Sequence, residues 1–74
     1  MEEIKNLMIE QISYMFANNG EKNTNISELL SQKIDDYCKD DDEEMSKIAE
    51  VGEIWRDLFI ARYNFVVNEI MFNQ

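Results

Sequence analysis

The most concentrated chemistry in this chain is a run of carboxylates near its middle. Seven of the ten residues at positions 35–44 are acidic, and a single lysine lies among them; the acids are Asp35, Asp36, Asp40, Asp41, Asp42, Glu43 and Glu44. A dense negative patch attracts basic surfaces and repels nucleic acid and anionic lipid. Calcium loops instead alternate their ligands around a glycine turn. Because this run contains no glycine, we expect no defined metal site.

The acidic run also has a structural interpretation, and both interpretations stay open. Acids at positions 40–44 would cap a following helix, where each well-placed charge contributes about 0.3–1 kcal/mol. Two acids would be enough for capping, whereas Asp35 and Asp36 oppose the dipole at the end of a preceding helix. The run is therefore either a recognition surface for a basic partner or a solubilising charge run, which is common on loops and tails.

Catalytic chemistry has little support in this sequence. The chain has no histidine, so the usual general base near neutral pH is missing. Cys38 is the single cysteine, and we interpret it as a small residue on the buried edge of a helix rather than a nucleophile. The two glycines, Gly20 and Gly52, are isolated and cannot form a phosphate-binding loop. We predict a protein that is not an enzyme and uses no cofactor.

Composition predicts one folded domain spanning residues 1–74. Hydrophobic residues make up 45% of the chain, which is too many for intrinsic disorder despite a net charge of -9. The most apolar segment, residues 54–72, contains four charged residues and is therefore not a membrane span. The lone cysteine and the absence of a leader-like N-terminus predict a cytoplasmic protein. Seven scattered cations exclude a nucleic-acid-binding footprint.

Three helices are predicted, at about residues 2–18, 26–39 and 43–72, in an all-α three-helix bundle. Apolar residues recur at helical spacing in the first segment: Ile4, Met8, Ile12 and Met15. Asn19 or Gly20 can adopt the left-handed conformation that ends this helix. Asn25, with Glu28 three positions later, has the spacing of a capping box for the second helix. Asp40 with Glu43, or Asp41 with Glu44, offers a similar pair for the third.

The predicted third helix is too long for two shorter helices to cover. Thirty residues give about 45 Å of helix, whereas a compact domain of this size is only about 30 Å across. The helix therefore either kinks at Gly52 or projects. It is also apolar almost all round, which predicts a homodimer or a partner along one stripe. The residues of that stripe are Trp55, Phe59, Tyr63, Val66 and Ile70. A strand at 58–67 is the competing interpretation, but no second segment could pair with it.

These features lead to two functional hypotheses from different classes. In the first, the chain is a non-enzymatic inhibitor or regulator whose acidic run binds the basic, nucleic-acid-binding surface of another protein. The chain resembles in type the small acidic helical proteins of phages and mobile elements that inhibit host factors, some by imitating DNA; no motif carries the likeness. In the second, it is an assembly or scaffolding subunit that binds itself or a partner through the apolar C-terminal helix. Neither hypothesis includes direct contact with nucleic acid or a membrane.

Overall fold

The computed structural model describes residues 1–39 and 44–72, apart from the side chains of Glu44 and Phe72. It contains three helices: α1 (Glu2–Ala17), α2 (Thr24–Cys38) and α3 (Glu44–Phe72). The described part of the chain has no strand, so the all-α prediction is confirmed and the strand interpretation of residues 58–67 is wrong. The predicted start of the third helix at residue 43 and both of its predicted capping pairs involve residues 40–43, outside the described residues.

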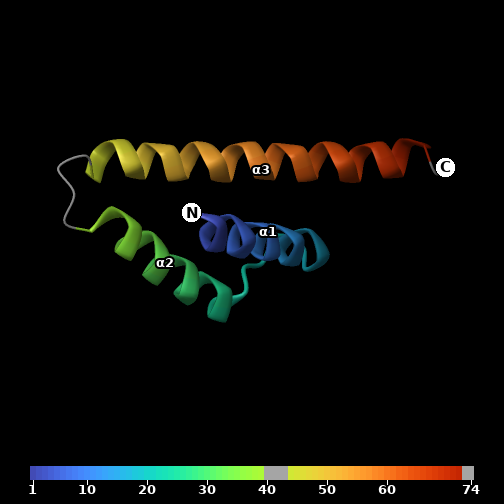
Figure 1. The fold of residues 1–74 in the computed structure, drawn as a ribbon. Helices are drawn as coiled ribbons and strands as arrows, with labels where there is room; N and C mark the ends of the chain where they lie inside the picture. The colour runs from blue at the N-terminus through green and yellow to red at the C-terminus, as the bar shows by residue number, and fades with distance from the viewer. Residues whose placement is uncertain (40–43, 73–74) are drawn as a thin grey trace.

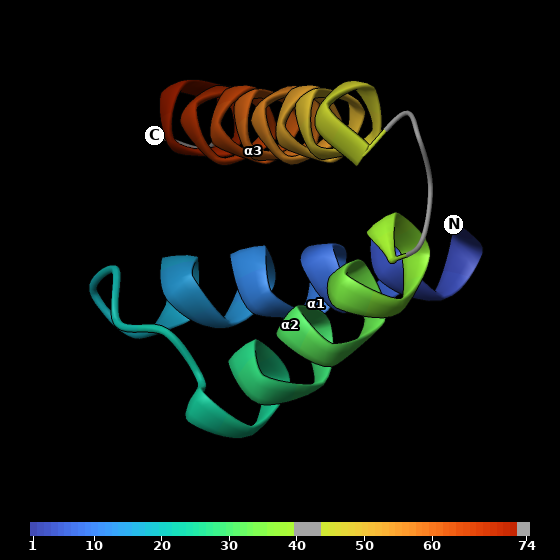
Figure 2. The same ribbon diagram turned by 90° about the vertical axis from the view of Figure 1, so that its left-hand side faces the viewer.

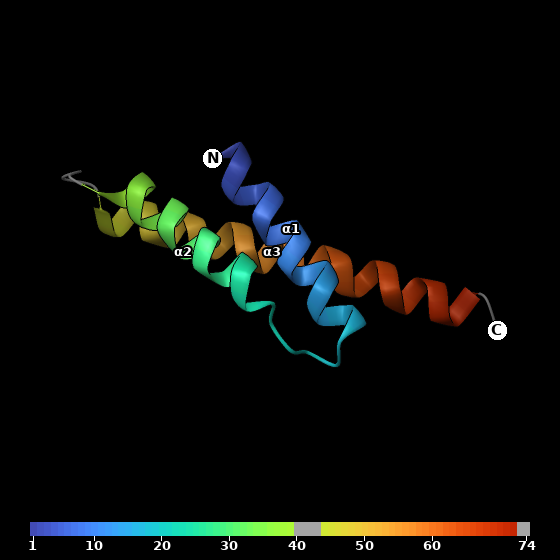
Figure 3. The ribbon, with the colours of Figure 1, turned by 90° about the horizontal axis from the view of Figure 1, so that it is seen from below.

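The helices form a small bundle in which α1 contacts both neighbours (Figure 1). α1 and α3 run in the same general direction, and α2 runs in roughly the opposite direction (Figures 1 and 3). Seen end-on, α1 and α2 lie side by side on one face of α3 (Figure 2). None of the helices in the described residues is long and apolar enough to cross a membrane.

The turn after α1 follows the sequence prediction. Asn19 and Gly20 both have positive φ, at 57° and 88°. The Gly20 N–H donates a hydrogen bond to the Met15 carbonyl at 2.8 Å, and the Asn18 N–H donates to the same oxygen at 3.2 Å. Both bonds satisfy the Met15 carbonyl, one of the last carbonyls of the helix, and the left-handed residues that follow bring the Gly20 N–H back to it.

The start of α2 differs from the prediction. The helix begins at Thr24, and its N-cap is Asn23, whose side-chain oxygen accepts a hydrogen bond from the Ile26 N–H at 3.0 Å. Asn25 lies inside the first turn, so the predicted capping box of Asn25 with Glu28 is wrong. The sequence offers asparagine at both positions, and the choice between them depends on a residue of α1.

That residue is Gln11, which is 1% exposed. Its side-chain amide donates to the Asn23 carbonyl at 3.1 Å and to the Ser27 hydroxyl at 2.6 Å. Its oxygen accepts from the Asn23 N–H at 2.8 Å. Because the backbone of Asn23 is held from both sides, this asparagine is fixed in the extended conformation that an N-cap requires.

The core lies where the three helices meet. Ile4 and Met8 of α1 and Val51 of α3 form its buried cluster, and Ile12 and Cys38 are also buried. Partly buried residues surround the cluster: Met1, Leu30, Ile34, Tyr37, Ile54, Trp55 and Leu58. The buried positions of Ile4, Met8 and Ile12 confirm the predicted stripe of α1, and Cys38 is on the buried edge of α2 as predicted.

α3 continues through Gly52 as one helix, so of the two alternatives left open by the sequence, a kink at Gly52 or a projecting end, the structure shows the projecting end (Figure 1). The far end of α3 extends beyond both other helices (Figures 1 and 3). The molecule measures 51 × 23 × 17 Å, with a radius of gyration of 14.2 Å. A compact chain of this length would have a radius of gyration of about 11 Å. The projecting end of α3, residues 63–72, is thus the main departure from a compact bundle.

Candidate interaction surfaces

The described part of the acidic run lies on the last turns of α2. Asp35 and Asp36 are exposed, and neither side chain has an ion pair or a hydrogen bond within residues 1–39 and 44–72. The remaining predicted residues of this surface fall outside the described set, completely or in their side chains: Asp40, Asp41, Asp42, Glu43 and Glu44. The described part of this surface is therefore its α2 border, Asp35 and Asp36.

Folding adds acids that the sequence analysis did not assign to this surface. An open depression of about 420 Å³ lies between the start of α1 and the end of α2. Its lining residues are Met1, Glu2, Glu3, Ile4, Lys33, Asp36 and Tyr37. Glu2 and Glu3 are far from Asp36 along the chain. Their sequence position alone indicates only acids that stabilise the first turn of a helix. We call Glu2, Glu3, Asp35 and Asp36 the acidic end.

The cation within this depression already has a partner. Lys33 Nζ lies 2.9 Å from a carboxylate oxygen of Glu3. The hydrogen bond and the charge of Lys33 hold the pKa of Glu3 below its ordinary value, and the same contact raises the pKa of Lys33. Both side chains are exposed, so the pair is worth little stability. The pair neutralises the charges of Glu3 and Lys33 locally. The net negative charge of the acidic end therefore comes from Glu2, Asp35 and Asp36.

Tyr37 fixes the end of α2 against the start of α3. Its hydroxyl donates a hydrogen bond to Glu50 at 3.1 Å, and its carbonyl accepts one from Lys47 Nζ at 3.2 Å. The Lys47 ammonium also lies 4.8 Å from the centre of the Tyr37 ring. Partial burial, followed by the bond to Glu50, raises the pKa of the Tyr37 hydroxyl. These contacts join the last turn of α2 to the first turns of α3.

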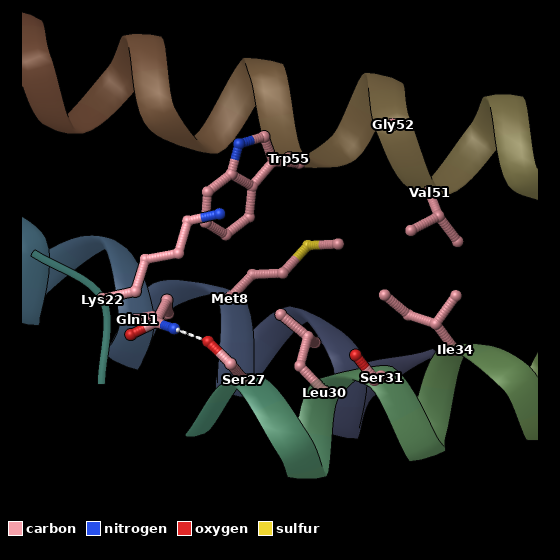
Figure 4. A pocket seen from close by; sticks show the side chains of 10 residues that line it. All are labelled: Met8, Gln11, Lys22, Ser27, Leu30, Ser31, Ile34, Val51, Gly52 and Trp55. Atoms are coloured by element: carbon pink, nitrogen blue, oxygen red, sulfur yellow. Dashed lines mark hydrogen bonds between the residues drawn. The ribbon is translucent and has the colours of Figure 1, made fainter. Parts of the chain in front are cut away.

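A second depression, of about 370 Å³, opens between α2 and α3 with α1 as its floor (Figure 4). Met8 extends from α1 into the space, Leu30 and Ile34 enter from α2, and Val51 and Trp55 enter from α3 (Figure 4). Its other lining residues are Gln11, Lys22, Ser27, Ser31 and Gly52. The surface suits an apolar side chain. It was missed by sequence reasoning because its residues come from three separate segments.

The structure divides the predicted apolar stripe of α3 into two parts. Trp55 and Phe59 are half-buried within the bundle: the Phe59 ring lies 5.3 Å from that of Phe16 and 6.5 Å from that of Trp55, centroid to centroid. Val66 is half-buried, whereas Tyr63 and Ile70 are 54% and 55% exposed. The bundle thus covers the first part of the stripe, and the second part runs along the projecting end.

Two further residues of the projecting end are exposed and apolar. Phe65 and Met71 are 53% and 68% exposed. Together with Tyr63 and Ile70 they place large apolar side chains on several sides of a single helix. Isolated surface apolar residues are normal, but four large ones within nine residues of one helix mark the projecting end as a candidate interaction site.

No protein-family model, no curated protein and no solved structure matches this chain. Within the described residues, no group of three or more histidine, cysteine, aspartate or glutamate side chains is arranged to hold a metal ion. The acidic end and the projecting end are the two surfaces of the described residues with an excess of exposed charge or of exposed apolar side chains.

Proposed function

We propose that this chain is a non-enzymatic interaction protein whose acidic end binds a basic, nucleic-acid-binding surface of another protein. Occupying that surface would exclude nucleic acid from it, so the chain would act as an inhibitor or regulator. Proteins of this type are encoded by phages and mobile elements, and the lone Cys38 suits the reducing cytoplasm.

The observation that carries the proposal is the meeting of acids from two helices. The α2 residues Asp35 and Asp36 lack an ion pair within the described residues, and Glu2 and Glu3 of α1 border the same end of the bundle. Helix-dipole stabilisation explains Glu2 and Glu3 but not Asp35 and Asp36, which lie at a helix C-terminus. Charge complementarity of this kind mainly accelerates encounter and makes binding salt-dependent.

A charge-reversal series tests the acidic end. The chain is immobilised, cytoplasmic extract is passed over it, and retained proteins are released with increasing salt. We expect basic, nucleic-acid-binding proteins to be released early and to be lost from the variant Asp35→Lys/Asp36→Lys. Lysine near a helix C-terminus interacts favourably with the dipole, so this variant should keep its fold, which circular dichroism checks.

The matched control reverses two acids elsewhere. Glu10→Lys/Glu28→Lys changes the net charge by the same amount at exposed positions outside the acidic end. Retention that falls equally in both variants would attribute binding to net charge alone and contradict a localised surface. Retained proteins that survive high salt in both variants would also contradict it.

The projecting end favours a second function, that of an assembly subunit which binds itself or a partner through apolar contacts. The exposed Tyr63, Phe65, Ile70 and Met71 are the observation in its favour. Truncation after Arg62 removes these residues and leaves the contact of Phe16 with Phe59 in place. Loss of salt-resistant association on truncation would support this function, and loss of salt-sensitive binding alone would support the acidic end.

A further inference from the structure

An arginine of α3, Arg62, lies one residue before the projecting end and beside α1. Arg62 is half-buried and borders a small depression with Ile9, Ile12 and Ser13 of α1 and with Leu58. Its Nε is buried and has no hydrogen-bond partner. The centre of its guanidinium lies 5.3 Å from the centre of the Phe65 ring. A buried N–H without an acceptor is unfavourable, and Arg62 is therefore held at some cost between α1 and the projecting end.

Glu69 is the nearest acid further along the same face of α3. It is exposed and has no ion pair within the described residues. Seven residues are close to two helical turns, so Arg62 and Glu69 share a face, with Phe65 and Val66 between them. Seven residues also separate them by about 10 Å along the axis. Side chains pair within one helix at three or four residues, so these two cannot neutralise each other in one chain.

This face is complementary to a copy of itself turned end for end. It has a cation at one end, an anion two turns later and apolar residues in the middle. In an antiparallel pair related by a two-fold axis between positions 65 and 66, each Arg62 faces the Glu69 of the other chain. A two-fold interface repeats every contact, so both ion pairs form together. We propose that two copies of this chain form an antiparallel dimer through the projecting ends of α3, with Arg62 and Glu69 paired reciprocally.

The exposed area of the chain supports a second copy as the occupant. The accessible surface is 5652 Å², whereas a folded monomer of this mass exposes about 4,800 Å². The excess of roughly 900 Å² is close to the ~800 Å² that each partner contributes to a standard protein interface. An antiparallel pair of projecting ends would cover the same segment that makes the molecule longer than a compact bundle.

Charge selects the antiparallel arrangement over the parallel one. Each chain carries a net charge of -9, and the acidic end lies away from the C-terminal end of α3 (Figure 1). Parallel pairing would bring the two acidic ends together, and it would also place Arg62 beside Arg62 and Glu69 beside Glu69. Antiparallel pairing separates the acidic ends to opposite poles, where they are screened from each other.

The dimer deepens the self-association proposed for the projecting end and rests on it. It uses a different surface from the acidic end, so the two proposals can be tested independently. If both are correct, one particle presents two acidic poles. The two helices would overlap over residues 59–72, about 20 Å, which is the projecting end together with the turn from Phe59 to Arg62 beside α1. Each chain is 51 Å long. The dimer would therefore measure about 80 Å from pole to pole, which is long enough to engage two basic sites at once.

Charge exchange tests the dimer directly. Sedimentation equilibrium should show a dimer for the natural chain. The single variants Arg62→Glu and Glu69→Arg should each raise the dimer dissociation constant at least about tenfold, because like charges then face each other at both ion-pair positions. The double variant Arg62→Glu/Glu69→Arg restores opposite charges and should recover the dimer. Arg56→Glu is the matched control, since Arg56 is exposed on the same helix and contacts Asp57; it should leave the dimer unchanged.

Two further measurements keep the test decisive. Circular dichroism identifies any variant that unfolds, and Glu69→Arg tests the contact at an exposed position outside the bundle. Small-angle scattering should give a longest dimension near 80 Å for the antiparallel dimer. A natural chain that stays monomeric up to millimolar concentration would overturn the proposal. So would a double variant that stays monomeric while folded, or a dimer little longer than one chain.

Discussion

The rings of Phe16 and Phe59 pack with their centroids 5.3 Å apart and their planes tilted by 38°. Phe16 is next to the last residue of α1, so this contact lies where α1 stops covering α3. On the α3 side, Phe59 also approaches Trp55, at 6.5 Å. The covered and projecting parts of α3 thus meet close to one aromatic contact.

A double-mutant cycle should measure that contact. Phe16→Leu and Phe59→Leu remove the ring pair while keeping apolar side chains, and we expect a coupling free energy of about 0.5–1.5 kcal/mol. Chemical denaturation gives the free energy of unfolding for each variant. The control cycle pairs Phe16→Leu with Phe65→Leu, since Phe65 is more than half exposed. Equal coupling in both cycles would contradict a specific contact between Phe16 and Phe59.

Gln11 should be one of the most sensitive positions for stability. Replacing it with alanine leaves the Asn23 N–H and carbonyl and the Ser27 hydroxyl without their buried partner. We expect a loss of about 1–3 kcal/mol in the free energy of unfolding. Gln32→Ala is the matched control: Gln32 is an exposed residue of α2, and its change should stay within about 0.5 kcal/mol. A neutral Gln11→Ala would mean that water replaces these bonds.

The two glycines should respond to alanine in opposite directions. Gly52 lies inside α3, and a Cβ there would meet no atom within 4 Å, so Gly52→Ala should stabilise the protein by about 0.5–1 kcal/mol. A Cβ at Gly20 also has space, but Gly20 has a φ of 88°, a conformation unfavourable for alanine. Gly20→Ala should therefore destabilise by about 1 kcal/mol or more. Thermal unfolding of both variants compares the two effects, and a destabilising Gly52→Ala would show an unseen requirement at that position.

The Glu3–Lys33 pair predicts a specific acid dependence. Because Lys33 lowers the pKa of Glu3 in the folded chain, the stabilisation is present above the ordinary value of 4.5 and is lost as pH falls through the lower, folded value. The contribution is small because both groups are exposed. In Lys33→Met, the pKa of Glu3 should rise towards its ordinary value, as followed by NMR titration of its carboxyl carbon.

Lys39→Met provides the control for the loss of a positive charge. Lys39 is an exposed lysine one residue after α2, and no ion pair joins it to Glu3. The pKa of Glu3 should stay low in this variant. A pKa that rises equally in both variants would assign the effect to overall charge rather than to the 2.9 Å contact.

Local signals in the sequence were sufficient for much of the fold. Ile4, Met8 and Ile12 repeat with helical spacing, and the asparagine and glycine at positions 19 and 20 favour positive φ; the structure confirms both predictions. The predicted cap at Asn25 failed because a contact distant in sequence selected Asn23 instead. Gln11, twelve residues earlier, holds that backbone, and no short-range pattern reveals such a bond.

The candidate surfaces were predictable only in part. The run of acids at 35–44 and the apolar character of residues 54–72 are visible in composition. The addition of Glu2 and Glu3 to the acidic end was not visible, because it depends on how α1 packs beside α2. Nor could the sequence show that the bundle covers Trp55 and Phe59 but leaves Tyr63 and Ile70 exposed.

By itself the sequence determined three helices, a negative net charge and a third helix too long for its neighbours, since each follows from residue type, spacing and rise per residue. Only the tertiary structure decided that α3 continues through Gly52 and which of its faces is covered. The physical reason is that a glycine permits a kink without requiring one. Which part of α3 is buried depends on where the shorter helix α1 ends. Beyond that end, the Nε of Arg62 has no acceptor and the last turns of α3 project past α1 (Figure 1).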